Sequence, residues 1–221
     1  MATAHDAPQS SRRDRLIELL ENSPVVPVMT IERLEHAVPL AEALVAGGLR
    51  LLEITLRTPV ALKAAEAIIN DVPEAVVGIG TVLSEEDLAL ASGIGVQFAL
   101  SPGATPNLLE AARRHDLPFI PGIATASELM AALEHGFDLV KFFPAVPAGG
   151  IAMLKARAGP FPQARFCPTG GIDGANAREW LTQQNVVAVG GSWLTPAEDI
   201  RQGAWGTITE RVRQTLSQLP T

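Results

Sequence analysis

The chain repeats one unit from about residue 25 onward, a short apolar run followed by an amphipathic stretch. Eight apolar runs occur, beginning at Val25, Leu51, Ala75, Gln97, Pro118, Leu139, Arg165 and Val186. Strict alternation of strands and helices predicts a mainly parallel sheet, because each helix returns the chain to the same end of the sheet. Eight units favour an α/β fold built as a closed (β/α)8 TIM barrel, whose usual size is about 250 residues. A doubly wound open sheet is the alternative, although the first run is not followed by the Gly-x-Gly-x-x-Gly turn typical of that fold.

Helical stretches lie between the runs, and several begin with good capping residues. The expected helices include 36–46, 84–92, 106–114, 127–135 and 175–183. Ser84, Ser127 and Asp173 are the expected caps. Two further helices flank the repeat: residues 11–21, which would cover the barrel floor, and residues 207–219. We therefore expect one domain over residues 15–221, preceded by a flexible tail over residues 1–14.

Composition limits the kinds of partner and compartment. The chain has 221 residues, of which 47% are hydrophobic and 19% charged, enough for one large core. A formal net charge of −7 argues against nucleic acid or an anionic membrane surface as a partner. No apolar run approaches the roughly 18 residues that span a bilayer, and the N-terminus does not read as a signal peptide. Cys167 is the single cysteine, which excludes an internal disulfide. These features predict a soluble cytoplasmic protein.

A lysine interrupts the sixth apolar run. Lys141 stands in the segment 138–145, DLVKFFPA. Side chains alternate faces in a strand, so Leu139, Lys141 and Phe143 share one side, and no carboxylate among them can pair the ammonium group. In the alternative interpretation, the stem of the lysine packs on the strand and its ammonium group reaches solvent. Burial instead favours the neutral amine, which can attack a carbonyl carbon and form a Schiff base.

Polar residues end the second apolar run on one face. Glu53, Thr55 and Arg57 alternate with the apolar residues Leu52, Ile54 and Leu56. The apolar set should face the helices, which places the polar set in the barrel mouth. Arg57 could then bind a substrate carboxylate through two parallel hydrogen bonds, and Glu53 could move protons. A structural Glu–Arg pair is the alternative, but residues four apart in a strand are too distant for easy contact.

Small and hydroxyl-bearing residues end three other runs. The seventh and eighth runs end at Thr169-Gly170-Gly171 and Gly190-Gly191-Ser192. Paired glycines let backbone N–H groups approach an anion, and the loops after strands 7 and 8 are the recurrent phosphate site of barrels. Either pair alone could be only a tight turn. Thr81, in phase with Val77 and Ile79 after the third run, could bind a carboxylate or carbonyl oxygen, although such a threonine is more often a cap.

Taken together, these segments resemble the 2-dehydro-3-deoxy-phosphogluconate (KDPG) aldolase and 4-hydroxy-2-oxoglutarate (KHG) aldolase family. The resemblance is carried by Glu53 to Thr58 (EITLRT), Gly80 to Leu83 (GTVL), Ser101 to Gly103 (SPG), Ile120 to Gly122 (IPG), Lys141 to Ala145 (KFFPA), Arg165 to Ile172 (RFCPTGGI) and Gly190 to Leu194 (GGSWL). These segments lie at nearly every expected strand end. The N-terminal tail to about Asp14 has no counterpart in the family pattern.

The resemblance implies a class I aldolase that needs no metal or other cofactor. Such an enzyme cleaves 2-dehydro-3-deoxy-6-phosphogluconate to pyruvate and D-glyceraldehyde 3-phosphate in the Entner–Doudoroff pathway, typically as a homotrimer. It makes Lys141 the Schiff-base lysine and Glu53 the general acid and base. Arg57, Thr81, Pro102, Phe143 and Thr169 would bind the substrate, and Gly170, Gly171, Gly191 and Ser192 would bind its phosphate.

Three other functions stay open at this stage. A sibling aldolase would act on the C4-epimeric galactonate or on 4-hydroxy-2-oxoglutarate, although the hydroxyl of Thr169 favours the gluconate. A metal-dependent barrel enzyme would need histidine and carboxylate ligands at strand ends, whereas His5, His36, His115 and His135 fall in the tail or in helical stretches. A sugar-phosphate-binding barrel without catalysis would have no use for Lys141 together with Glu53.

Overall fold

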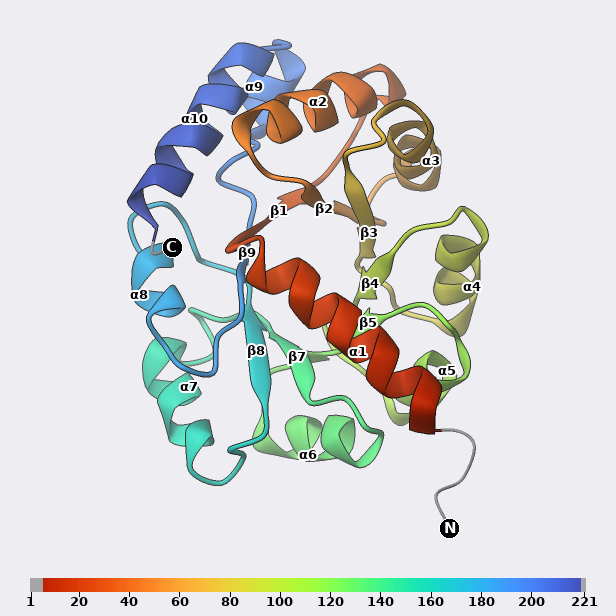
Figure 1. The fold of residues 1–221 in the computed structure, drawn as a ribbon, viewed down its shortest axis with the longest axis vertical. Helices are drawn as coiled ribbons and strands as arrows, with labels where there is room; N and C mark the ends of the chain where they lie inside the picture. The colour runs from red at the N-terminus through yellow and green to blue at the C-terminus, as the bar shows by residue number, and fades with distance from the viewer. Residues whose placement is uncertain (1–5, 220–221) are drawn as a thin grey trace.

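The strands of the protein form two parallel sheets (Figure 1). The structure is a computed structural model that describes residues 6–219, with side chains from residue 14 onward. The larger sheet has six strands in the order β5-β4-β3-β2-β1-β9 and is curled. Its members are β1 (Val25–Met29), β2 (Leu51–Thr55), β3 (Val76–Gly80), β4 (Phe98–Leu100), β5 (Phe119–Ile120) and β9 (Val189–Gly191). The smaller sheet consists of β6 (Gly122–Ile123), β7 (Leu139–Phe142) and β8 (Arg165–Pro168). The predicted α/β class and parallel sheet are confirmed.

Helices surround the strands, as the alternation predicts (Figure 1). They are α1 (Asp6–Glu21), the 3-10 turn η1 (Leu34–His36), α2 (Ala37–Gly47), α3 (Ala61–Asp71), α4 (Glu85–Gly93), α5 (Pro106–Arg114), α6 (Ala126–Glu134), α7 (Gly150–Ala158), α8 (Ala177–Leu181), α9 (Ala197–Arg201) and α10 (Trp205–Gln218). Ser84 caps α4 in a capping box with Asp87. The cap of α6 is Thr125 rather than the expected Ser127, because the helix begins one residue earlier, at Ala126. Within the described residues, no helix is long and apolar enough to cross a membrane.

Two of the eight predicted strands differ from expectation. The fifth run is interrupted at Pro121, between β5 and β6, because proline has no N–H to donate to a strand ladder. The eighth run begins at Val186, but β9 begins at Val189. Closure of the barrel is also only partial by strand pairing. Between β8 and the last run, only the bridges Phe166 to Val186 and Thr169 to Gly190 form.

The strands separate two apolar clusters on their opposite faces. The outer cluster contains Leu52, Ile54, Val77 and Ile79 together with buried residues of the surrounding helices. The inner cluster contains Val26, Leu51, Phe98, Leu100, Ile120, Leu139, Cys167 and Ala188. This alternation is the expected one, since neighbouring strand residues point to opposite faces.

Helix α1 covers the N-terminal ends of the strands (Figure 1). Leu16 and Leu20 of α1 are 3% and 1% exposed and belong to the inner cluster. The predicted floor helix is thus confirmed, but it begins at Asp6, five residues before the expected residue 11 and within the stretch expected to be a tail. Closing this end with apolar side chains leaves the C-terminal ends of the strands as the place for a site.

Candidate active site

Lys141 and Glu53 form a buried ion pair in the interior. Lys141 Nζ lies 2.9 Å from Glu53 Oε1, and the two side chains are 6% and 1% exposed. The prediction that no carboxylate on the same strand pairs the ammonium group is confirmed. No acid lies on β7 itself, but β2, 88 residues away in sequence, supplies one. Glu53 Oε2 is also buried and has no hydrogen-bond partner among the described residues.

Glycines on the neighbouring strands make room for this pair. A Cβ atom on Gly80 would lie 2.0 Å from Glu53 Oε1. Gly122 stands beside Lys141 in the parallel register of β6 and β7, and a Cβ atom there would lie 2.3 Å from the Pro102 carbonyl carbon. Both distances are too short for a real side chain, so each position requires glycine. Pro102 thereby lies against the strand position that neighbours Lys141, but it does not occur in the described lining of the cavity, so its place in the pocket stays a prediction.

A cavity of about 400 Å³ opens at the C-terminal ends of the strands. Its lining includes Arg57, Phe143, Thr169, Gly170, Gly171, Gly191 and Ser192, all predicted site residues, together with Val28, Thr30, Ile172, Thr195, Pro196, Ala197 and Ile200. The cavity is linked to the buried pair by Phe143, whose ring centroid lies 5.6 Å from Lys141 Nζ. Val28 provides a second link, because it stands beside Glu53 in the register of β1 and β2. Lys141 and Glu53 do not themselves occur in the described lining, but each of them has a neighbour that does.

Arg57 reaches the cavity from a turn rather than from the strand. Strand β2 ends at Thr55, and Arg57 follows in the turn after it, exposed. Thr55 points inward, as the parity predicts, but it is fully buried and its hydroxyl donates to the Met29 carbonyl at 3.0 Å. A guanidinium group at the rim can bind an entering carboxylate without the cost of burying an unpaired charge.

Thr81 differs from the predicted strand phase. It follows Gly80 with φ of 64°, a left-handed conformation that is uncommon for threonine. Val77 and Ile79, the residues in phase with it, belong to the outer cluster. If β3 continued as a regular strand, the side chain of Thr81 would therefore face the helices. The left-handed conformation at Thr81 interrupts this alternation of faces. Thr81 does not occur in the described lining of the cavity, and its role in binding stays a prediction.

The two glycine-rich loops meet at one edge of the cavity. Gly170 and Gly171 have φ of 100° and 79°, which only glycine adopts without strain. A Cβ atom on Gly190 would lie 2.3 Å from Thr169 Oγ1, so the two strand ends pack closely. Asn176 Nδ2 donates to the Gly171 carbonyl at 3.0 Å and holds the first loop in shape. Gly171 and Ser192 are exposed, and backbone N–H groups and hydroxyls in such loops are suited to bind an anion.

Cys167 stands beside Lys141 in the register of β7 and β8 but belongs to the apolar interior. Burial, opposed in part by the charge of Lys141, raises the pKa of the Cys167 thiol to about 12. A thiol that stays protonated is a poor nucleophile. The Cys167 sulfur is therefore not suited to act as the nucleophile of the site.

Helices α6 and α7 support the strand pair that carries the lysine. Glu128 Oε2 accepts hydrogen bonds from the backbone N–H groups of Ala124 at 2.7 Å and Thr125 at 2.8 Å. Arg157 of α7 donates to the Ala124 carbonyl, and its guanidinium carbon lies 4.5 Å from the ring centroid of Phe142. Ala124 follows β6 and Phe142 ends β7, so these contacts fix both strands beside Lys141.

Sequence reasoning did not single out Thr30 or Thr195 as residues of the site. Thr30 follows β1 directly, and a hydroxyl at the C-terminal end of a barrel strand was the signal that could have identified it. Thr195 lies in the segment between β9 and α9, where no strand pattern marks it. Its hydroxyl approaches the Ser192 carbonyl at 3.5 Å.

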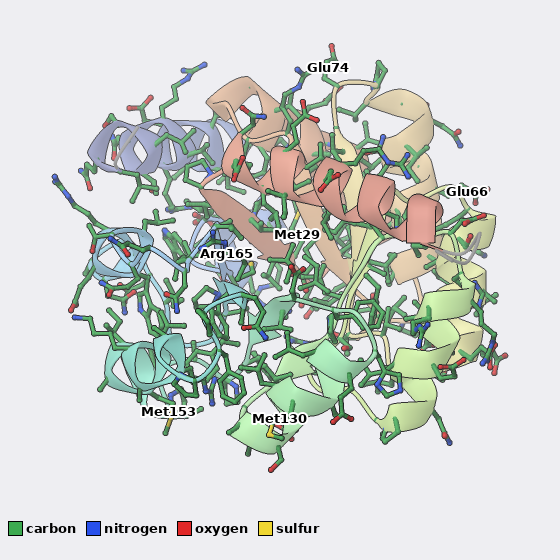
Figure 2. The ribbon with its side chains drawn as sticks, turned by 60° about the horizontal axis from the view of Figure 1, so that its bottom comes forward. Met29, Glu66, Glu74, Met130, Met153 and Arg165 are labelled. Atoms are coloured by element: carbon green, nitrogen blue, oxygen red, sulfur yellow. The ribbon has the colours of Figure 1, made fainter. Side chains whose placement is uncertain are left out.

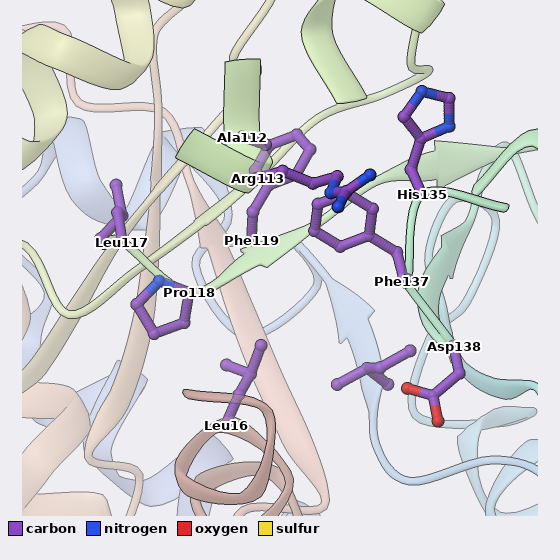
Figure 3. Close-up of a pocket in the computed structure, with 11 residues that line it drawn as sticks. Leu16, Ala112, Arg113, Leu117, Pro118, Phe119, His135, Phe137 and Asp138 are labelled. Atoms are coloured by element: carbon purple, nitrogen blue, oxygen red, sulfur yellow. The ribbon is translucent and has the colours of Figure 1, made fainter. Parts of the chain in front are cut away.

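The opposite end of the strands holds two cavities that Leu16 helps to line, one of about 380 Å³ and a smaller one of about 60 Å³ (Figure 3). Leu16 of α1 points into the smaller cavity, and the rings of Phe119 and Phe137 meet edge to face beside it with centroids 5.9 Å apart. This lining is mainly apolar and belongs to the packing of α1. Over the described part of the chain, no group of three or more His, Cys, Asp or Glu residues could hold a metal ion.

Comparisons with known proteins agree with this arrangement. The family model described as KDPG and KHG aldolase matches residues 16–211. The KHG/KDPG aldolase of Escherichia coli K12 is 52% identical over 198 residues, covering 90% of this chain and 93% of the relative. The 2-dehydro-3-deoxy-phosphogluconate aldolase of Dickeya dadantii is 50% identical, with 90% and 94% covered.

A solved structure is similar in both sequence and fold. It is the KDPG aldolase of Legionella pneumophila, with pyruvate captured as a covalent carbinolamine intermediate. The two chains are 50% identical with a TM-score of 0.88, and the alignment covers 90% of this chain and 97% of the other. The match of family model, curated relatives and structure leads to one conclusion: this chain belongs to the KDPG and KHG aldolase family.

Proposed function

We propose that the protein is a class I aldolase that cleaves 2-dehydro-3-deoxy-6-phosphogluconate to pyruvate and D-glyceraldehyde 3-phosphate through a Schiff base on Lys141. The observation that carries this proposal is the buried contact of 2.9 Å between Lys141 Nζ and Glu53 Oε1 beside the cavity. Support comes from relatives named for this activity and from the covalent pyruvate adduct of the Legionella enzyme.

The first chemical step needs a neutral amine, and Glu53 is placed to provide it. Transfer of a proton from Lys141 Nζ to Glu53 Oε1 leaves a neutral amine and a neutral carboxyl, so the pair carries no net charge before or after. Nζ then attacks C2 of the keto acid, and the carbonyl oxygen takes up a proton to give a carbinolamine. The Glu53 carboxyl then gives its proton to the carbinolamine hydroxyl, which leaves as water, so that the iminium ion forms on Lys141 and Glu53 becomes a carboxylate.

The second step breaks the carbon–carbon bond. The Glu53 carboxylate takes the proton of the C4 hydroxyl, the C3–C4 electron pair moves into the iminium ion, and glyceraldehyde 3-phosphate leaves. The remaining enamine receives a proton at C3 from Glu53. Addition of water then releases pyruvate and restores the amine. Glu53 Oε2, which has no described protein partner, is free to contact the substrate in these steps.

Residues of the cavity lining, together with Thr81 and Pro102 outside it, are proposed to hold the two charged ends of the substrate. Arg57, with Thr81, binds the pyruvoyl carboxylate, while Pro102 and Phe143 line that end and Thr169 faces the substrate hydroxyls. Gly170, Gly171, Gly191 and Ser192 bind the phosphate. Anchoring both ends positions the scissile bond against Lys141 and Glu53, which converts binding energy into rate.

Further features of the proposal concern the whole molecule. We propose that the two sheets act as one closed (β/α)8 barrel, since β5 and β6 are separated only by Pro121 and bridges connect β8 to the last run. The cytoplasmic homotrimer, and the division into a tail over residues 1–14 and a domain over residues 15–221, remain predictions. Light scattering coupled to size-exclusion chromatography tests the trimer.

Met130 and Met153 are 51% and 41% exposed and point outward from α6 and α7, whereas Met29 is buried in the interior (Figure 2).

A second candidate substrate is 4-hydroxy-2-oxoglutarate, because the family and the Escherichia coli relative carry both activities in their names. This compound has a carboxylate where the gluconate derivative continues to its phosphate, so it cannot use the glycine loops as a phosphate site.

The direct test is to measure pyruvate release from both compounds and from the C4-epimeric galactonate. We expect the highest kcat/KM for the phosphogluconate derivative and no turnover by Lys141→Ala, whereas treatment with EDTA should leave the rate unchanged. Equal kcat/KM for 4-hydroxy-2-oxoglutarate would contradict the substrate assignment, and turnover by Lys141→Ala would contradict the Schiff base.

A further inference from the structure

We propose that Thr30 is a specificity-determining residue that accepts a hydrogen bond from the C5 hydroxyl of the substrate, the hydroxyl between the scissile bond and the phosphate. This inference rests on the proposed aldolase function and deepens it. It follows from a chain of hydrogen bonds whose direction the buried groups determine.

The series of hydrogen bonds begins at a backbone carbonyl oxygen, which can only accept a hydrogen bond. Thr55 Oγ1 donates to the Met29 carbonyl oxygen at 3.0 Å, and Thr55 is fully buried. A threonine hydroxyl has one proton, so Thr55 has no second proton to give. Thr30 Oγ1 lies 3.1 Å from Thr55 Oγ1. In this contact Thr30 must therefore be the donor and Thr55 the acceptor.

The direction of this hydrogen bond determines whether the Thr30 hydroxyl can donate to a ligand in the cavity or only accept from it. Its single proton is directed to Thr55, so only oxygen lone pairs remain for a ligand. Thr30 lines the cavity and is partly buried. A phosphate or carboxylate oxygen, which also carries lone pairs, is a poor partner for it. An alcohol O–H is a good partner, because it can donate.

The position of β1 indicates which alcohol. Strand β1 lies between β2 and β9 in the sheet. Val28 stands beside Glu53 on one side, and Pro27 stands beside Gly191 on the other. Val28 and Thr30, two residues apart, both line the cavity. In the proposed function Glu53 acts at the C4 hydroxyl and Gly191 binds the phosphate on C6. Thr30 lies between these elements, where the C5 hydroxyl would be.

The test runs the reaction in the direction of condensation, with pyruvate and two aldehydes. D-Glyceraldehyde 3-phosphate carries the hydroxyl that becomes the C5 hydroxyl, whereas 3-oxopropyl phosphate lacks only this group. We expect Thr30→Val to lower kcat/KM for the first aldehyde about three- to tenfold, the range of a lost neutral hydrogen bond. For the second aldehyde, kcat/KM should change by less than about twofold. Thr30→Ser keeps the hydroxyl and should retain the preference of the wild type.

Two controls make the result specific. Thr58→Val removes a threonine hydroxyl that donates to the Ile31 carbonyl at 2.6 Å and does not line the cavity, so it should lower kcat/KM for both aldehydes equally or not at all. Thr30→Val leaves the bond from Thr55 to Met29 in place and should fold. If it does not, Thr30→Ala replaces it in the same comparison.

The outcomes separate this inference from the aldolase assignment. An equal loss of kcat/KM on both aldehydes, or no loss on either, overturns the role of Thr30. Wild-type protein that traps no pyruvate on Lys141 with borohydride overturns the aldolase function. Normal trapping by Thr30→Val, combined with a loss of preference for the hydroxylated aldehyde, supports both.

Discussion

Lys141 and Glu53, which lie on β7 and β2, meet through a contact of 2.9 Å in a part of the interior where both are almost fully buried. A buried ion pair is weak evidence for stability, because the loss of hydration can exceed the attraction between the charges. The position of this pair beside a cavity lined by glycine loops and by Arg57 indicates a chemical role instead.

Breaking this ion pair by removing one partner should be costly. In Lys141→Met, Glu53 remains buried without a cation, and we expect the free energy of unfolding to fall by about 3 to 5 kcal/mol. The double variant Lys141→Met/Glu53→Gln removes both charges and should recover most of this loss. Urea unfolding at pH 8 measures both. A double variant no more stable than Lys141→Met would show that the charge of Glu53 is not the cause.

Gly80→Ala should reduce activity by displacing Glu53. The added methyl group would fall 2.0 Å from Glu53 Oε1, so the carboxylate must move away from Lys141. A displacement of about 1 Å in a reacting group can cost up to about 100-fold in kcat. Gly159→Ala is the matched control, because a Cβ atom there has nothing within 4 Å. Equal kcat values for the two variants would argue against the importance of this geometry.

The Glu128 cap should make stability depend on pH. Burial opposes ionisation of Glu128, but hydrogen bonds from the N–H groups of Ala124 and Thr125 outweigh it and hold its pKa below the ordinary value of 4.5. A lowered pKa in the folded protein contributes stability above the ordinary value and loses it as pH falls through the folded value.

Glu128→Gln should therefore weaken the loss of stability as pH falls below about 4.5. Urea midpoints recorded from neutral to acidic pH measure the slope. Glu66→Gln, at an exposed position on α3 (Figure 2), should keep the wild-type slope. Identical slopes for wild type and Glu128→Gln would contradict the role of this cap.

The fold could be predicted from the sequence largely because strands and helices alternate so regularly. Every apolar run contains a strand, although the fifth run is divided into β5 and β6, and the parity of Leu52 and Ile54 correctly placed them against the helices. Pro121 could have been identified as a break from its missing N–H, but the local pattern of apolar residues masks it.

The site was harder to predict from the sequence than the fold, because it depends on contacts between distant segments. Period-2 alternation describes the faces of one strand and cannot show that Glu53 meets Lys141 across 88 residues. It also fails where a strand ends. Thr81 takes a left-handed turn with φ of 64°, and Arg57 already lies in a turn, so the parity of β3 and β2 no longer applies to them. Thr30 was missed because its one signal, a hydroxyl at the C-terminal end of an expected strand, is weak when it stands alone.

Reductive trapping tests the proposed chemistry most directly. The wild-type protein is incubated with pyruvate and borohydride, digested, and analysed by mass spectrometry, with Glu53→Gln and Lys141→Ala in parallel. We predict that the wild type and Glu53→Gln carry one reduced pyruvate adduct on Lys141, and that Lys141→Ala carries none. An adduct on another lysine, or no adduct on active wild-type protein, would contradict the assignment of Lys141 as the Schiff-base residue.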